Sequence, residues 1–114
     1  MSEYFYPVDG RKHYKDLEKA QKDMFEAFRD FNNEIFEKES ALSRKTKELI
    51  AIGVAHTTQC PYCIDGHVRA AKKAGASDQE IAEAIFVASA LRAGGAFAHS
   101  TIAMRALNEA KEQK

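Results

Sequence analysis

Apolar side chains recur along this chain at the three- and four-residue spacing of helices, and no segment shows the alternation of apolar and polar residues that is typical of a strand. The pattern predicts an all-α fold with about five helices in a single domain, residues 1–114. Residues 1–13 are expected to form an irregular arm. A long helix then covers residues 14–38, and its broad apolar stripe indicates a deeply packed helix whose aromatics belong to the core. The stripe consists of Leu17, Met24, Phe28, Phe31 and Ile35, and it is widened by Phe25 and Phe36.

Two further helices are predicted in the middle of the chain from their start and stop signals. Ser43 can cap a helix that continues to about Thr58. Pro61 is suited to the first position of the next helix, because a residue there does not need a backbone N–H. Gly75 is expected to end that helix.

The last third of the chain predicts two more helices. Ser77 and Glu80 have the S-x-x-E spacing of a capping box, which opens a helix to about Arg92. The pair Gly94–Gly95 is expected to break it, before a last helix over residues 96–110.

Residues 81–91 are apolar on nearly every face of the helix that they are predicted to form. A helix of this kind is normally buried all round, and a chain of 114 residues has little interior in which to bury one. We therefore predict a homo-oligomer whose subunits contact one another through this helix.

Charge and composition narrow the class of protein. Seventeen basic and seventeen acidic residues give a formal net charge of zero, which argues against nucleic-acid binding and against attraction to anionic membranes. Residues 1–10 lack the basic and apolar pattern of a secretory signal. Residues 81–98 are the most apolar stretch, but Glu83, Arg92 and the two glycines interrupt it, so we predict no membrane span. A cytoplasmic location is expected.

The two cysteines, Cys60 and Cys63, lie within four residues of each other. Such a pair is more typical of a catalytic or metal-binding site than of a secreted disulfide scaffold. If Pro61 begins a helix, Cys60 is its cap and Cys63 lies in its first turn, where free N–H groups and the positive helix end stabilise a thiolate. The i, i+3 spacing also allows a disulfide. We predict a redox pair; the alternative is two small buried apolar residues.

Histidines and one acid are further candidates for the chemistry. His67 lies four residues after Cys63, one helical turn along the same face, and could accept the thiol proton. Composition alone makes Glu48 a solvated acid near a helix start. His56 and His99 fit structural roles better than functional ones.

Glu48, the Cys-Pro-Tyr-Cys element at residues 60–63 and His67 together resemble the E-x11-C-x-x-C-x-x-x-H signature of the alkyl hydroperoxidase D (AhpD) group, in the carboxymuconolactone decarboxylase-like family. The similarity covers about residues 42–107. It implies an all-α fold assembled into trimers or hexamers. It also implies a thiol-dependent oxidoreductase that reduces peroxides or disulfides with a thiol reductant or reductase, without a metal or other cofactor.

The resemblance also implies roles for individual residues. Cys63 would be the thiolate that attacks the peroxide, and Cys60 the resolving partner. His67 and Glu48 would form the proton relay that ionises Cys63. The better-known AhpD proteins are longer and carry a histidine between the cysteines, where this chain has Tyr62. The decarboxylases of the family lack the cysteine pair, so lactone decarboxylation is not implied.

Three alternatives come from other classes of protein. Cys-Pro-Tyr-Cys is also the glutaredoxin tetrapeptide, but there it follows a first strand near the N-terminus. Cys60, Cys63 and His67, with His56 or His99, could supply four zinc ligands, although no second tight pair of ligands is present. A helical assembly module without enzymatic activity would tolerate alanine at both cysteines.

Overall fold

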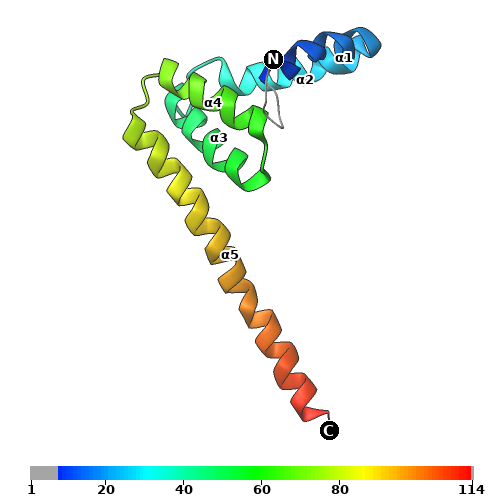
Figure 1. Ribbon diagram of the computed structural model, residues 1–114, viewed down its shortest axis with the longest axis vertical. Helices are drawn as coiled ribbons and strands as arrows, with labels where there is room; N and C mark the ends of the chain where they lie inside the picture. The colour runs from blue at the N-terminus through cyan, green and yellow to red at the C-terminus, as the bar shows by residue number, and fades with distance from the viewer. Residues whose placement is uncertain (1–7, 114) are drawn as a thin grey trace.

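The computed structural model describes residues 8–113, and over this range it contains helices and no strands (Figure 1). This confirms the predicted all-α class. Residues 1–7 of the expected irregular arm lie outside the described residues, while its remainder forms a 3-10 helix. The elements are η1 (Val8–His13), α1 (Tyr14–Ala20), α2 (Lys22–Phe36), α3 (Arg44–Thr58), α4 (Pro61–Lys73) and α5 (Asp78–Glu112).

A small bundle of α3, α4 and the first turns of α5 holds the core. Ile52 of α3 and Ala71 of α4 have no exposed surface, and Ala76 and Ile81 pack against them. Alanines allow the helices to approach closely around one large side chain. Full burial of an isoleucine side chain stabilises a fold by about 1.5–3 kcal/mol. The core is therefore small, and Ile52 is its centre.

The helix ends in this bundle form at the residues that the sequence predicted. Ser43 caps α3, and its hydroxyl oxygen accepts a hydrogen bond from the backbone N–H of Thr46 at 3.1 Å. Pro61 is the first residue of α4. After α4, Gly75 takes a φ of 95°, a left-handed conformation that glycine adopts without strain.

A capping box at the start of α5 also forms as predicted. The Ser77 hydroxyl accepts from the Glu80 N–H, and the Glu80 carboxylate accepts from the Ser77 N–H at 2.9 Å. Glu80 also pairs with Lys45 of α3 at 3.0 Å. The backbone hydrogen bond and then Lys45 lower the pKa of the Glu80 carboxyl below its ordinary value. These contacts join the start of α5 to α3.

The predicted single helix over residues 14–38 is wrong, because the chain turns at Gln21 between α1 and α2. The turn brings Arg29 within 3.4 Å of Glu18. In one straight helix these two residues would be separated by about 16 Å along the axis. The chain thus forms two shorter helices, α1 and α2, whose side chains contact each other, instead of one continuous helix.

The deep packing expected of the first helical segment is also absent. No residue of α1 or α2 is buried, and the large side chains of Met24, Phe28 and Phe31 are mostly exposed. Their periodicity correctly indicates a helical apolar face. Among the described residues of one chain, however, little lies against that face.

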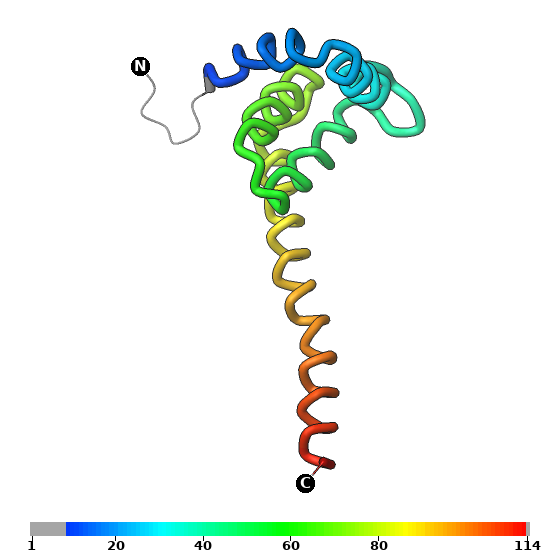
Figure 2. The backbone as a smooth tube through the Cα atoms, turned by 90° about the vertical axis from the view of Figure 1, so that its right-hand side faces the viewer, coloured from blue at the N-terminus to red at the C-terminus, as the bar shows by residue number. Residues whose placement is uncertain are grey.

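The break expected at Gly94–Gly95 does not occur. Helix α5 continues through both glycines, although each costs about 1 kcal/mol relative to alanine within a helix. Alanines around them favour the helix and compensate. The helix then extends alone, away from the bundle, to the C-terminal end (Figures 1 and 2). Within the single chain only Ile81 and Ala88 of α5 are buried, so the expected contacts between subunits through residues 81–91 stay a prediction.

Candidate redox site

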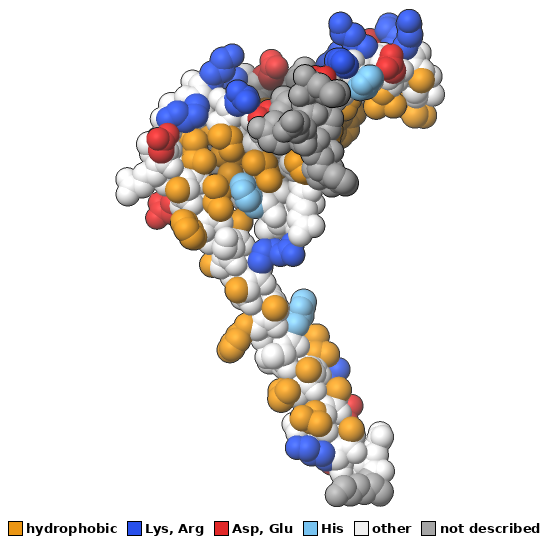
Figure 3. All heavy atoms as spheres, viewed as in Figure 1, with side chains coloured by type: hydrophobic (Ala, Val, Ile, Leu, Met, Phe, Trp, Pro, Cys, Tyr) orange, Lys and Arg blue, Asp and Glu red, His pale blue; other side chains and the backbone are white. Residues whose placement is uncertain are grey.

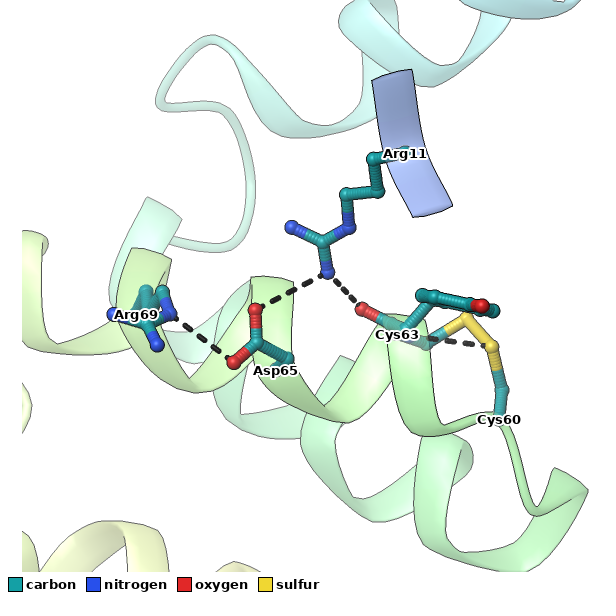
Figure 4. A network of polar contacts seen from close by, with 6 residues as sticks. Arg11, Cys60, Cys63, Asp65 and Arg69 are labelled. Carbon is teal, nitrogen blue, oxygen red and sulfur yellow. Dashed lines mark hydrogen bonds and ion pairs between the residues drawn. A yellow bond between two sulfur atoms is a disulfide. The ribbon is translucent and has the colours of Figure 1, made fainter. Parts of the chain in front are cut away.

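The two cysteines form a disulfide at the N-terminus of α4 (Figure 4). Cys60 is the residue that caps the helix, and Cys63 lies in its first turn, with 5.2 Å between their Cα atoms. The backbone N–H of Cys63 donates to the Cys60 sulfur at 3.2 Å. The predicted placement of both residues is confirmed. Because the cap sulfur receives a backbone N–H at the positive helix end, a thiolate on Cys60 is stabilised there.

His67 and Glu48 meet next to the cysteine pair. Nδ1 of His67 donates to the Glu48 carboxylate at 2.6 Å, which joins α4 to α3. Only 6% of Glu48 is exposed. The interpretation from composition, that Glu48 is a solvated acid, is therefore wrong. Glu48 lies one turn before Ile52 on the buried face of α3, and this i, i+4 relation is the signal that could have placed it inside.

Phe36, at the end of α2, adds a third wall to the site. Its ring centroid lies 4.8 Å from that of His67. The sequence indicated Phe36 only as part of an apolar stripe. With its ring against Phe36 and its Nδ1 bonded to Glu48, the His67 side chain is fixed from two sides.

Arg11 of η1 holds the N-terminal segment against the redox helix (Figure 4). Its guanidinium donates to the backbone carbonyl of Tyr62 and pairs with Asp65 at 3.5 Å. A Cβ at Gly66 would lie 3.0 Å from the guanidinium, so a larger residue there would require the Arg11 side chain to shift by a few tenths of an ångström. Arg11 was not among the residues predicted from the sequence, because 51 positions separate it from Tyr62 and no local pattern links them.

All four predicted site residues line one cavity of about 500 Å³. Other polar groups from α2 and α3 also line it. The wall includes Glu48, Cys60, Cys63 and His67, together with Asn32, Asn33 and Arg44. A cavity of this size holds a small molecule or a short extended segment of another chain.

The other two histidines lie outside this site. Nδ1 of His56 bonds to the carbonyl oxygen of Ile52 at 2.8 Å, within α3. His99 lies on the exposed part of α5. Among residues 8–113, no three histidine, cysteine or acidic side chains come together as a metal site. The zinc alternative thus gains no support from the geometry.

Two curated proteins are similar to this chain in sequence. "Uncharacterized protein 4 in cox locus" of Paracoccus denitrificans is 52% identical over 71 residues, which are 62% of this chain and 64% of that protein. "Uncharacterized protein YdfG" of Bacillus subtilis (strain 168) is 42% identical over 48 residues, or 42% of this chain and 33% of that protein. The matched regions thus span about two thirds and one third of these relatives' lengths.

A solved structure is similar over most of the chain. The crystal structure of apo-lpg0406, a carboxymuconolactone decarboxylase family protein from Legionella pneumophila, superposes with a TM-score of 0.69. The match covers 89% of each chain at 29% sequence identity. The described helices therefore have the arrangement of a known family fold.

The sequence profile of the carboxymuconolactone decarboxylase family matches residues 22–106, a range that includes the cysteine pair, His67 and Glu48. That family contains the AhpD group, whose signature these residues resemble. The chain belongs to the carboxymuconolactone decarboxylase family.

Proposed function

We propose that this protein is a thiol-dependent oxidoreductase of the AhpD type, which reduces peroxides or disulfides through Cys60 and Cys63. The observation that carries the proposal is the hydrogen bond, 2.6 Å long, between the half-buried His67 and the buried Glu48, one helical turn from a cysteine pair at a helix N-terminus. A cysteine thiol is activated as a nucleophile when a nearby base can take its proton and a third group orients that base.

In the oxidising half of the reaction, Cys63 is the nucleophile. His67 takes the thiol proton on Nε2, while Glu48 holds the ring through Nδ1. The thiolate attacks one peroxide oxygen, the O–O bond breaks, and the other oxygen leaves as an alcohol or water after it gains a proton. Cys63 is now a sulfenic acid. The Cys60 sulfur attacks it and expels water, which leaves the disulfide.

In the reducing half, an external thiolate attacks the Cys63 sulfur and Cys60 leaves as a thiolate. A stabilised leaving thiolate departs faster. The N–H of Cys63, which points at the Cys60 sulfur, supplies that stabilisation. A second external thiol then releases Cys63 and carries away the oxidising equivalents. We propose the reducing cytoplasm as the location, because it supplies such thiols.

A thiol count and an intact mass test this function. Reduced protein treated with one equivalent of hydrogen peroxide should lose both free thiols and the mass of two hydrogen atoms, with no oxygen retained. A dithiol should then restore both thiols. The proposal fails if both thiols survive, or if oxygen is added without formation of the disulfide.

Serine variants separate the two cysteines. Cys60→Ser should react once and stop at a sulfenic acid, which a dimedone adduct reports by its mass. Cys63→Ser should react far more slowly, because Cys60 has no histidine one turn away on the same helix face. If Cys63→Ser instead reacts at the faster rate, the roles of the two cysteines are exchanged.

A further inference from the structure

The peptide group that joins Tyr62 to Cys63, which we call the 62–63 peptide, has a hydrogen-bond partner on each side (Figure 4). Its N–H belongs to Cys63 and donates to the Cys60 sulfur at 3.2 Å. Its carbonyl belongs to Tyr62 and accepts from the Arg11 guanidinium. Because the peptide is trans and planar, the carbonyl and the N–H point in opposite directions. One peptide group therefore connects a cation in η1 with a sulfur of the redox pair.

The position of Arg11 is set by a second contact with α4. Asp65 pairs with the guanidinium through Oδ2 at 3.5 Å, and Arg69 pairs with the other carboxylate oxygen at 3.1 Å. The Oδ2 atom is buried, so a negative charge there requires a cation close by, and Arg11 supplies it. The Tyr62 ring lies against η1, since the Cβ position of Gly10 is 2.9 Å from the phenol oxygen. These contacts hold the guanidinium on the Tyr62 carbonyl.

A cation on the carbonyl strengthens the hydrogen bond on the other side of the same peptide. Hydrogen bonds in a chain polarise one another, and a charged donor polarises the carbonyl more than a neutral one does. Electron density drawn toward the carbonyl oxygen leaves the N–H more positive. A more positive N–H stabilises a thiolate better than a thiol. The gain falls on the sulfur that receives this N–H, which is that of Cys60.

We propose that Arg11 is a positioning residue that stabilises the Cys60 thiolate through the 62–63 peptide. The inference rests on the proposed function, in which Cys60 is the leaving sulfur. When an external thiolate attacks the Cys63 sulfur, a new S–S bond forms, the bond between the two cysteines breaks, and its electron pair stays on Cys60. A thiol with a lower pKa leaves faster. Arg11 thus serves the reducing half of the reaction, whereas His67 serves the oxidising half.

Arg69 provides a matched control for Arg11. It is also an arginine, and it pairs with the same Asp65 carboxylate, but on the side away from the cysteines (Figure 4). Other charged or titratable side chains line the cavity that contains Cys60, and all of them stay unchanged in the variants compared. They are Tyr14 of α1, Glu37 directly after α2, Arg44 and Glu48 of α3, and His67 of α4. A difference between the two arginine variants therefore reports the contact with the 62–63 peptide.

The pH dependence of Cys60 alkylation tests the proposal. In a Cys63→Ser background, the backbone N–H at position 63 remains and Cys60 is the single thiol. Its rate of alkylation by iodoacetamide is measured against pH, with folding checked by circular dichroism. Arg11→Gln should move the midpoint upward by a few tenths of a pH unit, and Arg69→Gln should leave it unchanged. Arg11→Lys keeps a charged donor and should restore most of the original midpoint.

The amide proton of Cys63 reports the hydrogen bond itself in the disulfide form. Its NMR resonance should move upfield in Arg11→Gln, because a weaker hydrogen bond leaves the proton more shielded, and should stay in place in Arg69→Gln. Dithiothreitol should reduce the disulfide of Arg11→Gln about twofold more slowly than that of the wild type.

Three results would overturn the proposal: equal midpoint shifts in Arg11→Gln and Arg69→Gln, an unchanged midpoint and amide resonance in Arg11→Gln, or a midpoint in Arg11→Lys equal to that in Arg11→Gln. Equal shifts would place the effect on Asp65 and its charge rather than on the peptide group. Alkylation and the amide resonance require no turnover of peroxide or disulfide. They are therefore independent of the thiol count after peroxide, and the proposed function can fail or survive separately.

Discussion

The bundle of α3, α4 and the first turns of α5 is rich in apolar side chains, and so is the α5 tail, residues 96–112. The apolar side chains of the bundle are packed, whereas those of the tail are exposed (Figure 3). Ile52 of the bundle has no exposed surface, whereas Ile102 of the tail is 57% exposed. His67 is fixed between Glu48 and Phe36, while His99 lies on an exposed helix surface. Isoleucine and histidine therefore each occur in a packed position of the bundle and in an exposed position of the tail.

The difference shows what prepares a side chain for chemistry. A histidine becomes a useful base when a buried partner fixes its orientation and its tautomer. The bundle provides that partner because Glu48 shares a helix face with Ile52. The tail has equally apolar neighbours along its own helix, but among residues 8–113 no second element packs across from it.

The histidine pair should show the largest effect. His67→Ala should slow the reaction of reduced protein with peroxide by about 10²–10⁴-fold, the usual contribution of a positioned base. His99→Ala should leave this rate unchanged at a low protein concentration, where subunits are separate. Stopped-flow measurement of thiol loss at pH 7 compares the two. Equal slowing by both variants would show that the exposed histidine also serves the reaction.

The isoleucine pair should differ in stability. Ile52→Ala empties the centre of the core and should cost about 2–5 kcal/mol in the free energy of unfolding. Ile102→Ala should change it by less than about 0.5 kcal/mol, as exposed positions do. Urea denaturation at low protein concentration, where subunits are separate, provides the comparison. A large loss for Ile102→Ala under these conditions would mean that the tail packs within its own chain.

The serine pair should show a smaller effect. Ser77→Ala removes the cap of α5 and should cost about 1 kcal/mol. Ser100→Ala, within the tail, should be neutral or slightly stabilising, because alanine is the better helix former. Thermal unfolding followed by circular dichroism measures both. A cost at Ser100 equal to that at Ser77 would argue against the cap as the cause.

Glu80 should add a small pH dependence. Its pKa is lowered in the folded chain, so the ionised form stabilises the fold. This contribution is present above about pH 4.3, the ordinary value for glutamate, and is lost as the pH falls through the lower value of the folded chain. Glu80→Gln keeps a capping side chain without the charge. Its stability should therefore fall less between pH 5 and about pH 2 than that of the wild type; a parallel fall would contradict the assignment.

The sequence predicted local features of the fold well. Caps at Ser43 and Ser77, the start at Pro61 and the end near Gly75 each depend on one or two adjacent residues. The site residues followed from one helical turn and one family signature. Features that depend on residues close together in the sequence can be predicted from a single sequence.

Features that depend on distant contacts were not predictable in the same way. The turn at Gln21 follows from contacts between α1 and α2, and the continuity of α5 through its glycines follows from the helix formers on both sides. The apolar stripes correctly predicted helices but wrongly predicted their burial. Periodicity reports which face is apolar, and it carries no information on what covers that face.

The central claim is that Glu48 acts on Cys63 only through His67, and a double-mutant cycle tests it most directly. In a Cys60→Ser background, the rate of Cys63 alkylation by iodoacetamide is measured against pH for His67→Ala, Glu48→Gln and the double variant, with folding checked by circular dichroism. We predict that His67→Ala moves the pH midpoint of alkylation upward, that Glu48→Gln moves it less, and that the double variant matches His67→Ala alone. Two independent shifts that add in the double variant would contradict the relay.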